Sequence, residues 1–518
     1  MDQHIDQTEE VAEAFKVLRL QQLQNTNSYP HKFLTTKTFA QYRQRYDTLE
    51  TGSRHHEFPE SLAGRVQEKR ESGNKLVFYT VISDGLTIQY LCDKREYLNP
   101  ENFKKDNDLI HRGDIIGVTG FAGKSLKGEL SIYVLSITLL SPCLKVLPKA
   151  NFGLKDPDIR ARKRYFDLIA NPDTRNVFII RSLVFKELRR YLDDQGFIEV
   201  QTPILSLSAG GASAKPFMTY HNDLDQDMAL RIAPELFLKQ LVVGGLNRVY
   251  EIGPQFRNEG IDPSHNPEFS SLEFYMAYAD YNDLFTMCED IFARIVLSIH
   301  GTLKIKYQPL NKEERIIDFT PPYRRIDMMS ELENRIGITF PKDLSSDETR
   351  TMLDDLCTSL KVECGHPRTN ARLIDKLVGH FIEPDCQNPT FIMNQPLVMS
   401  PLAKQHRHNP QLSERFELFV TGMELANAYT ELNDPQVQRE RFESQLKAKN
   451  QGDDEAQGID ETFIDSLEYG LPPTGGFGLG IERLVMLMTN KNTIRDVITF
   501  PSVTDLNKKT VIDPNENK

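Results

Sequence analysis

Residues 255–278, "QFRNEGIDPSHNPEFSSLEFYMAY", alternate charged and aromatic side chains between two segments of strand-like composition. Successive side chains of a β-strand point to opposite faces of a sheet, so Arg257 and Glu259 are expected on one face, and Glu273 and Tyr275 likewise. An arginine on such a face can hold a carboxylate or a phosphate through two hydrogen bonds. The stretch therefore predicts two strands and a loop that grip a charged ligand, with a solvent-exposed hairpin as the alternative.

A second candidate strand lies in "ELANAYTELND" (424–434). Alternation places Asn427, Tyr429 and Glu431 on one face, but it puts Glu424 on the opposite face. Glu424 can join the others only if a β-bulge, which inserts one extra residue into a strand, lies between positions 424 and 427.

The glutamates of these segments set a condition on the site. Glu235, Glu273 and Glu431 on one buried face would be unstable without cations, because an unpaired buried charge costs several kcal/mol. Either the face is open to solvent or a cationic ligand fills it. Phe269 can stack on a planar base, although a core aromatic fits that position equally well.

A glycine-rich run near the C-terminus, "GGFGLGIERLVMLMT" (475–489), is expected to be a turn that enters an apolar helix at Gly480. Backbone N–H groups at a helix N-terminus bind anions, and Arg483 in the first turn adds positive charge. One such turn is a weak signal by itself. His265, in a proline-rich loop, is a weaker candidate for a phosphate contact.

The composition indicates a folded protein of at least two domains. Among its 518 residues, 39% are hydrophobic and the net charge is −12, so the overall charge does not indicate a nucleic-acid partner. No apolar run of about 18 residues occurs, and no membrane span is expected. The acidic N-terminus resembles neither a secretory signal nor a transit peptide, and a cytoplasmic location with reduced cysteines is expected. Cys357, Cys364, His366 and Cys386 lack the paired spacing of zinc sites.

Composition changes along the chain predict its domains. Residues 1–58 open with a helix in which Val11, Phe15 and Leu18 form an apolar stripe. About five short strand-like runs follow, which favours a five-stranded oligonucleotide-binding (OB) β-barrel. The expected segments are a helical extension at 1–58, the OB-fold barrel at 59–148, a linker at 149–170, a second domain at 171–502 with a helical insertion at about 300–412, and a flexible tail at 503–518.

One run imitates a phosphate-binding P-loop. In "GFAGKSLKG" (120–128), the glycine that must stand five residues before Gly-Lys-Ser is replaced by Val118, and Gly117 is one position too early. No long helix follows Lys124 either, so the run is interpreted as a turn between two strands.

The order of the segments resembles motifs 1, 2 and 3 of the class II aminoacyl-tRNA synthetases: a strand ending at Pro203, then "FRNE" (256–259) with a loop and second strand, then "GLGIER" (478–483). A barrel before that domain is similar to the subgroup that charges aspartate, asparagine and lysine. Other runs resemble the lysine enzyme in particular: "GGASAKPF" (210–217), "RIAPELFLKQLVVGG" (231–245), "EFYMAYADY" (273–281), "SPLAK" (400–404) and "NAYTELNDP" (427–435).

The resemblance implies an α+β fold, with an antiparallel-sheet catalytic domain preceded by a five-stranded OB-fold barrel that binds the anticodon. It implies an ATP-dependent lysine–tRNA ligase in which Arg257 and Arg483 are catalytic. Lysine contacts are implied for Gly211, Glu235, Arg257, Glu273, Tyr275, Asn427, Tyr429 and Glu431. ATP contacts are implied for Arg257, Asn258, Glu259, His265, Asn266, Phe269, Glu424, Leu425, Gly480, Ile481, Glu482 and Arg483.

By the same resemblance, Glu417 and Glu424 carry Mg²⁺, a cation suited to carboxylate and phosphate oxygens. In the barrel, Phe78 matches a position that stacks an anticodon base, and Gln89 and Glu129 match positions that read base edges. A core residue is the alternative for Phe78. The implied partners are L-lysine, ATP, tRNA(Lys) and a second copy of the chain, joined near Pro203, with no membrane.

Two departures and three alternatives accompany this interpretation. Residues 1–30 hold only Lys16 and Arg19 where eukaryotic relatives often carry a lysine-rich arm, and Phe477 stands where relatives can carry Trp. The alternatives are the aspartate or asparagine enzyme, a catalytically silent RNA-binding relative, and a relative that transfers lysine to a protein. The glutamate set argues against an aspartate pocket, because that pocket needs a cation opposite the side chain.

Overall fold

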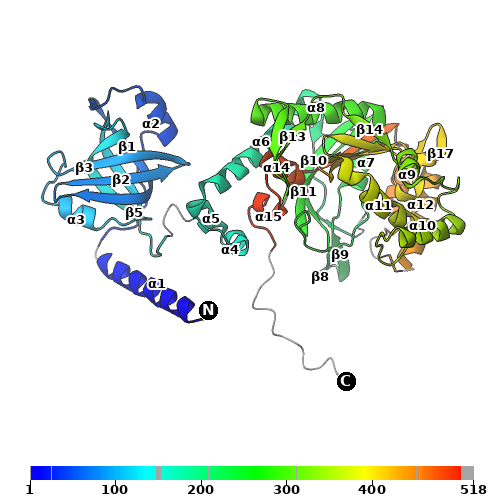
Figure 1. The fold of residues 1–518 in the computed structure, drawn as a ribbon, viewed down its shortest axis with the longest axis horizontal. Helices are drawn as coiled ribbons and strands as arrows, with labels where there is room; N and C mark the ends of the chain where they lie inside the picture. Colours follow the sequence, from blue (N-terminus) through cyan, green and yellow to red (C-terminus); the bar gives the residue numbers. More distant parts are fainter. Residues whose placement is uncertain are drawn as a thin grey trace, which may run out of the picture. The chain divides into compact units, whose positions relative to one another are not determined.

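The computed structural model describes residues 2–24, 26–147, 153–207, 210–310, 312–450, 452–453, 456 and 458–502 (Figure 1). The expected tail at 503–518, and residues 148–152 around the expected start of the linker, lie outside the described residues. The chain divides after Arg175 into two compact units.

The first unit contains the predicted five-stranded barrel, closed in the order β1–β2–β3–β5–β4 (Figure 1). Alternation along β2 buries Val77, Tyr79 and Val81. Helix α2 adds Phe39 and Tyr42 to the same core. The elements of this unit are α1 (Asp2–Gln22), α2 (Phe39–Tyr46), β1 (Arg54–Ser72), β2 (Leu76–Ser83), β3 (Leu86–Asp93), α3 (Phe103–Asp108), β4 (Ile115–Lys124), β5 (Leu130–Ser141), α4 (Pro157–Arg162), α5 (Arg164–Ala170) and the start of α6 (Pro172–Asp194).

The P-loop imitation is part of the barrel, as predicted. β4 continues through Lys124, and a turn closed by the Gly128 N–H and the Ser125 carbonyl, 2.9 Å apart, leads into β5. Backbone N–H groups that would cradle a phosphate are therefore committed to strand pairing with β1 and β5.

The apolar stripe predicted for the first helix is partly buried only at Phe15, whose ring centroid lies 6.5 Å from that of His111. Val11 is 67% exposed and Leu18 is 61% exposed, whereas Arg19 is buried. The Arg19 Nη2 lies 2.6 Å from Asp114 Oδ2 of the barrel. The C-terminal turn of α1 is thus held by a buried ion pair rather than by the predicted stripe.

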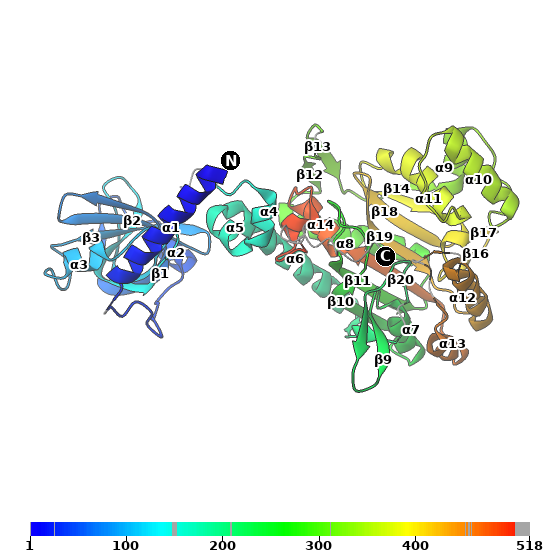
Figure 2. The ribbon, with the colours of Figure 1, turned by 90° about the horizontal axis from the view of Figure 1, so that it is seen from below.

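The second unit is built on a mostly antiparallel sheet. In the described part of this unit, eight strands pair in the order β14–β15–β18–β19–β20–β11–β10–β6, with parallel pairing at β14/β15 and β10/β6 (Figure 2). Their bounds are β6 (Ile198–Glu199), β10 (Arg248–Phe256), β11 (Glu268–Ala277), β14 (Arg324–Asp327), β15 (Thr390–Met393), β18 (Arg415–Val420), β19 (Met423–Thr430) and β20 (Thr474–Gly480). The arrangement confirms the predicted α+β fold.

One face of the sheet forms the main core with α6, α8 (Tyr281–His300) and α14 (Ile481–Met488). Leu272 and Phe274 of β11, and Phe477 and Leu479 of β20, are buried there. Phe274 and Phe477 stack with ring centroids 4.8 Å apart. Alternation then turns the intervening residues of both strands to the opposite face, which carries the candidate site.

The remaining elements surround this sheet. Helices α9, α10 and α11 gather at its β14 edge, within the expected insertion (Figure 2). The other bounds are β7 (Leu205–Ser206), β8 (Met218–His221), β9 (Gln226–Leu230), α7 (Glu235–Val243), β12 (Lys304–Tyr307), β13 (Arg315–Asp318), α9 (Met328–Ile336), α10 (Asp347–Ser359), α11 (Asn370–Phe381), η1 (Glu383–Asp385), η2 (Leu397–Met399), β16 (Gln405–His406), β17 (Asn409–Ser413), α12 (Pro435–Asn450), α13 (Glu461–Glu468) and α15 (Ile494–Val497).

Candidate active site

A cavity of about 900 Å³ lies on the face of the sheet opposite the main core. The structure brings most of the predicted site residues of the second unit to it, from segments that are far apart in the sequence. Those that line it are Gly211, Glu235, Arg257, Glu259, His265, Asn266, Phe269, Glu273, Tyr275, Glu417, Glu424, Leu425, Asn427, Tyr429, Gly480, Glu482 and Arg483. Asn258 and Glu431 do not line the cavity, and Ile481 is buried in the main core.

The floor of the cavity is a glycine strand. The turn predicted for 475–480 is wrong, because these residues form most of β20, which pairs with β11 and β19. Alternation sends Phe477 and Leu479 into the core, so that Gly476, Gly478 and Gly480 face the cavity. Glycine in a strand leaves room for another group to approach closely, and here it keeps the cavity open.

The predicted β-bulge is present in β19. Phe419 pairs with Glu424 but Leu418 pairs with Ala426, so Leu425 is the extra residue. The bulge brings Glu424 to the face that carries Asn427, which itself pairs with Glu417 of β18. A single inserted residue therefore unites the two carboxylates assigned to Mg²⁺ with the residues assigned to lysine.

A buried ion cluster joins α7 to the end of β19. Lys239 Nζ donates to Glu235 Oε1 at 2.7 Å and to Glu431 Oε2 at 2.9 Å. The Tyr429 hydroxyl lies 2.8 Å from both Glu235 oxygens. Lys239 is absent from the sequence prediction, because a lysine four residues after a glutamate has the spacing of an ordinary helical surface pair.

The cluster contains more carboxylates than cations. Burial raises the pKa of Glu273 to about 8, and the neighbouring Glu235 adds to the rise. Burial also raises the pKa of Glu431 well above its usual value, although Lys239 opposes that rise. Burial alone would lower the pKa of Lys239, but Glu235 and Glu431 raise it overall, so the lysine stays charged. The arrangement favours a ligand that brings positive charge.

Arg257 lies just beyond the end of β10, not within a strand as predicted. Its backbone N–H bonds to the Pro267 carbonyl at 2.9 Å, and its guanidinium carbon stands 5.1 Å from the centre of the Phe269 ring. Glu259 is exposed in the following loop, so the two residues do not share a strand face. Arg257 Nε is buried and has no hydrogen-bond partner among the described residues. An anionic ligand would satisfy it.

The N-terminus of α14 supplies a second cation. Arg483 Nη1 donates to the Glu424 carbonyl at 2.9 Å, and Nη2 lies 2.9 Å from His265 Nε2. The other ring nitrogen of His265 lies 2.7 Å from Asp262 Oδ2. These partners fit a neutral ring that donates from Nδ1 and accepts at Nε2. Arg483 and His265, which the sequence places 218 residues apart, are thus in direct contact.

Burial raises the pKa of Glu417 to about 7; Arg415 opposes this rise and Glu424 adds to it. Arg415 Nη2 donates to Glu417 Oε1 at 2.6 Å, and Arg415 Nε donates to Asn427 Oδ1 at 3.0 Å. No group of three or more His, Cys, Asp or Glu side chains in the described residues is arranged to hold a metal. Two carboxylates suit Mg²⁺, which keeps water and phosphate oxygens as further ligands.

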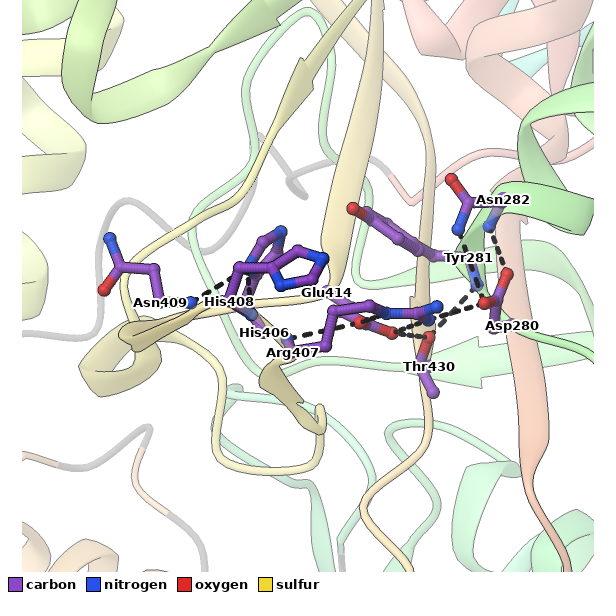
Figure 3. A network of polar contacts seen from close by, with 9 residues as sticks. All are labelled: Asp280, Tyr281, Asn282, His406, Arg407, His408, Asn409, Glu414 and Thr430. Carbon is purple, nitrogen blue, oxygen red and sulfur yellow. Dashed lines mark hydrogen bonds and ion pairs between the residues drawn. The ribbon is translucent and has the colours of Figure 1, made fainter.

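The end of β19 is held in place by a polar network (Figure 3). Thr430 Oγ1 donates to Glu414 Oε2 at 2.7 Å and accepts from the Tyr281 N–H at 3.1 Å. Arg407 Nη2, from the β16–β17 hairpin, bonds to Glu414 Oε2 at 2.9 Å and to Asp280 Oδ2 at 2.5 Å. Burial alone would raise the pKa of Glu414, but bonds from Arg407 and Thr430 lower it overall. The network fixes the residue that precedes Glu431.

The barrel presents the three predicted anticodon residues away from its core. Phe78 stands between buried Val77 and Tyr79 and is half-buried. It pairs with Leu91, two residues along from the Thr80–Gln89 pair, so Phe78 and Gln89 share a face. The Gln89 side-chain amide bonds to Glu129.

No helix among the described residues is long and apolar enough to span a membrane. Cys357 and Cys386 lie in the apolar core of the helical insertion with α10 and α11.

Comparison with known proteins agrees with both units. The model of the family "tRNA synthetases class II (D, K and N)" matches residues 156–504, and that of the "OB-fold nucleic acid binding domain" matches residues 61–140. The lysine–tRNA ligase cla4 of Cladosporium cladosporioides is 48% identical over 497 residues, covering 95% of this chain and 83% of the relative.

Two further relatives are similar over most of the chain. The probable cytoplasmic lysine–tRNA ligase of Encephalitozoon cuniculi is 46% identical over 492 residues, covering 94% of this chain and 95% of the relative. The lysine–tRNA ligase of Thermotoga maritima is 44% identical over 495 residues, covering 94% and 96%. The chain belongs to the class II tRNA synthetases of the D, K and N group.

Proposed function

We propose that this chain is an ATP-dependent lysine–tRNA ligase, which forms lysyl-adenylate and then transfers lysine to the 3′ end of its tRNA. The observation that carries the proposal is the excess of carboxylates at the cavity, where Glu235 and Glu431 share the buried Lys239 and Glu273 is buried near Glu235. Lysine brings two ammonium groups to this site. The relatives that are similar over most of the chain are named lysine–tRNA ligases, which supports the same substrate.

Different residues of the site hold the two ammonium groups of lysine. Gly211 and Glu235 hold the α-ammonium, and Gly211 lies close to Glu235 because it has no Cβ, which would stand 2.9 Å from Glu235 Cβ. Glu431 and Tyr275, supported by Glu273, hold the ε-ammonium. The set is completed by Asn427 and Tyr429.

ATP occupies the end of the cavity near the loop after β10. Phe269 stacks on the adenine, with Glu259 near its edge, and His265 and Arg483 face the phosphates. Leu425 and Gly480 line this end, and Asn258 and Ile481 are their assigned neighbours outside the cavity lining. Mg²⁺ on Glu417 and Glu424, when bound, neutralises phosphate charge.

The first step needs alignment more than proton transfer. The lysine carboxylate is already a nucleophile; one of its oxygens attacks the α-phosphorus, an O–P bond forms, and the bond to the β-phosphate oxygen breaks to release pyrophosphate. Arg257 binds the carboxylate and the α-phosphate together, which converts an encounter of two anions into an oriented reaction. Arg257 and Arg483 stabilise the charge that develops on the phosphate oxygens. In the second step a terminal ribose hydroxyl of tRNA takes the lysyl group and AMP leaves.

The proposal assigns anticodon recognition and catalysis to separate domains. Anticodon recognition belongs to the barrel at 59–148 through Phe78, Gln89 and Glu129, and catalysis belongs to 171–502. A cytoplasmic location is supported by the Encephalitozoon relative, which is named a probable cytoplasmic lysine–tRNA ligase.

A homodimer is part of the proposal. Exposed apolar side chains cluster in the sequence around Pro203, namely Ile198 (49% exposed), Ile204 (41%), Leu205 (46%) and Leu207 (66%). Such a group is typical of a surface covered by a partner. Sedimentation of the full chain at micromolar concentration should give twice the monomer mass of 59.5 kDa.

ATP–pyrophosphate exchange tests the function directly. Exchange that depends on lysine, and not on aspartate or asparagine, is the expected result, followed by charging of tRNA(Lys). Exchange with aspartate alone would sink the proposal in favour of the aspartate enzyme. Loss of all exchange would favour the catalytically silent relative, and transfer of lysine only to protein would favour the third alternative.

A further inference from the structure

Lys239 is the internal cation of the lysine pocket. Its side chain has no exposure to solvent, and it lies between two carboxylates whose residues are 196 positions apart (235 and 431). Its Nζ lies 2.7 Å from Glu235 Oε1 and 2.9 Å from Glu431 Oε2. The ammonium also stands 5.0 Å from the centre of the Phe463 ring. Lys239 does not line the cavity, whereas Glu235 does, so it acts from behind the carboxylates.

Glu431 has one carboxylate oxygen that Lys239 does not use. Glu431 Oε1 is buried and has no hydrogen-bond partner among the described residues. A Cβ added to Gly476, which lines the cavity, would collide with that same oxygen. Glu431 therefore uses one oxygen for Lys239 and directs the other toward Gly476 in the cavity floor.

The charges of the cluster set what the pocket accepts. When all three carboxylates are ionised, they and the one ammonium carry two negative charges, and Arg257 is available for a ligand carboxylate. A ligand with two ammonium groups and one carboxylate neutralises this set. Removal of the internal cation would leave three carboxylates against two ammonium groups, and a buried charge without its partner is strongly unfavourable.

We propose that Lys239 is a positioning residue that selects for lysine: its ammonium orients Glu235 and Glu431 toward the two amino groups and fixes the charge of the pocket at the value that a diamino acid balances. This inference rests on the proposed function. Lys239 touches no substrate atom, and it works through the two carboxylates.

The test is a double-mutant cycle on the full chain, measured by ATP–pyrophosphate exchange. In the Lys239→Met variant, the methionine side chain is close to lysine in length but carries no charge. It should raise the KM for lysine by about tenfold or more while the KM for ATP changes by about twofold or less. On a Glu431→Gln background, the same change should raise the lysine KM by about threefold or less, because residues that act through each other are not additive. Lys186→Met, on the exposed face of α6, is the matched control and should leave both KM values unchanged.

The outcomes separate the two proposals. If the unmodified chain shows no lysine-dependent exchange, the proposed function and this inference both fail. If it does, an unchanged lysine KM in Lys239→Met, or an equal rise in both KM values, overturns the inference alone. Should Lys239→Met not fold, Glu431→Gln is compared with the double variant, which removes both charges. A further tenfold rise in the double variant would assign Lys239 a general structural role.

Discussion

Arg181 and Glu482 form an ion pair between α6 and α14, with Arg181 Nη2 2.7 Å from Glu482 Oε1. The second Glu482 oxygen accepts the Ser270 N–H at 2.8 Å. Although Glu482 belongs to the "GLGIER" run, its carboxylate is committed to holding α6, β11 and α14 together. Both oxygens of a residue that the family pattern assigns to ATP are thus engaged by protein groups.

Arg181→Met should lower the free energy of unfolding by about 2 kcal/mol, because it leaves the buried Glu482 carboxylate with a single N–H partner. The matched control is Arg175→Met on the same helix, whose ion pair with Asp84 is exposed on both sides. That change should cost less than about 0.5 kcal/mol. Urea unfolding of both variants checks the difference, and equal losses would contradict the anchoring role.

Gly476→Ala should abolish most lysine activation. A Cβ at this position would meet Tyr275 Cε1 at 2.6 Å and would collide with the free oxygen of Glu431. At Gly478, on the same face of β20, a Cβ would lie 3.7 Å from Glu273 Cγ, an ordinary contact. Exchange assays should therefore show a loss of about 100-fold or more in kcat/KM for lysine in Gly476→Ala and a much smaller loss in Gly478→Ala. Equal losses would argue against the position assigned to the ε-ammonium.

The KM for lysine should depend on pH through Glu273. Burial raises the pKa of this carboxyl to about 8, so below that pH the free protein holds a proton there. An ammonium ligand favours the ionised form, and binding must release the proton. The KM should rise as pH falls from about 8 to 6, by up to about tenfold per pH unit.

Glu273→Gln should flatten this dependence, because an amide has no proton to release in this range. A lysine KM that stays constant from pH 8 to 6 in the unmodified chain would show that Glu273 does not face the ligand.

Phe78→Ala should raise the KM for tRNA by about tenfold, since a stacked base contributes about 1–3 kcal/mol. The exchange reaction needs no tRNA and should not change. Leu126→Ala provides the control, because Leu126 is 90% exposed in the turn between β4 and β5. Aminoacylation and ATP–pyrophosphate exchange are both measured for the Phe78→Ala and Leu126→Ala variants. A fall in both reactions for Phe78→Ala would indicate a folding defect in the barrel instead of a lost base contact.

Alternation along strands was the most productive sequence argument. It placed Glu273 beside Tyr275 and required the bulge that the structure shows at Leu425. It failed for Arg257 and Glu259, because β10 ends at Phe256 and the period of a strand has no meaning beyond its last residue. Composition likewise identified the five-stranded barrel, since its turns carry strong local signals.

Contacts between distant segments were beyond the sequence argument. Lys239 lies four residues after Glu235, as in many surface pairs, and only the fold, which brings Glu431 to α7, reveals its second partner. Arg415 was missed for the same reason, because its bonds to Glu417 and Asn427 depend on the pairing of β18 with β19. The stripe of the first helix is largely exposed, and periodicity alone does not tell whether anything covers a helix.

The bulge at Leu425 also separates two tasks along one strand. Before the bulge stands Glu424, which is proposed for the metal, and after it stand Asn427 and Tyr429, which are proposed for lysine. On this proposal, substitutions from Asn427 onward can change the amino-acid preference while Glu424 keeps its place beside Phe419 of β18.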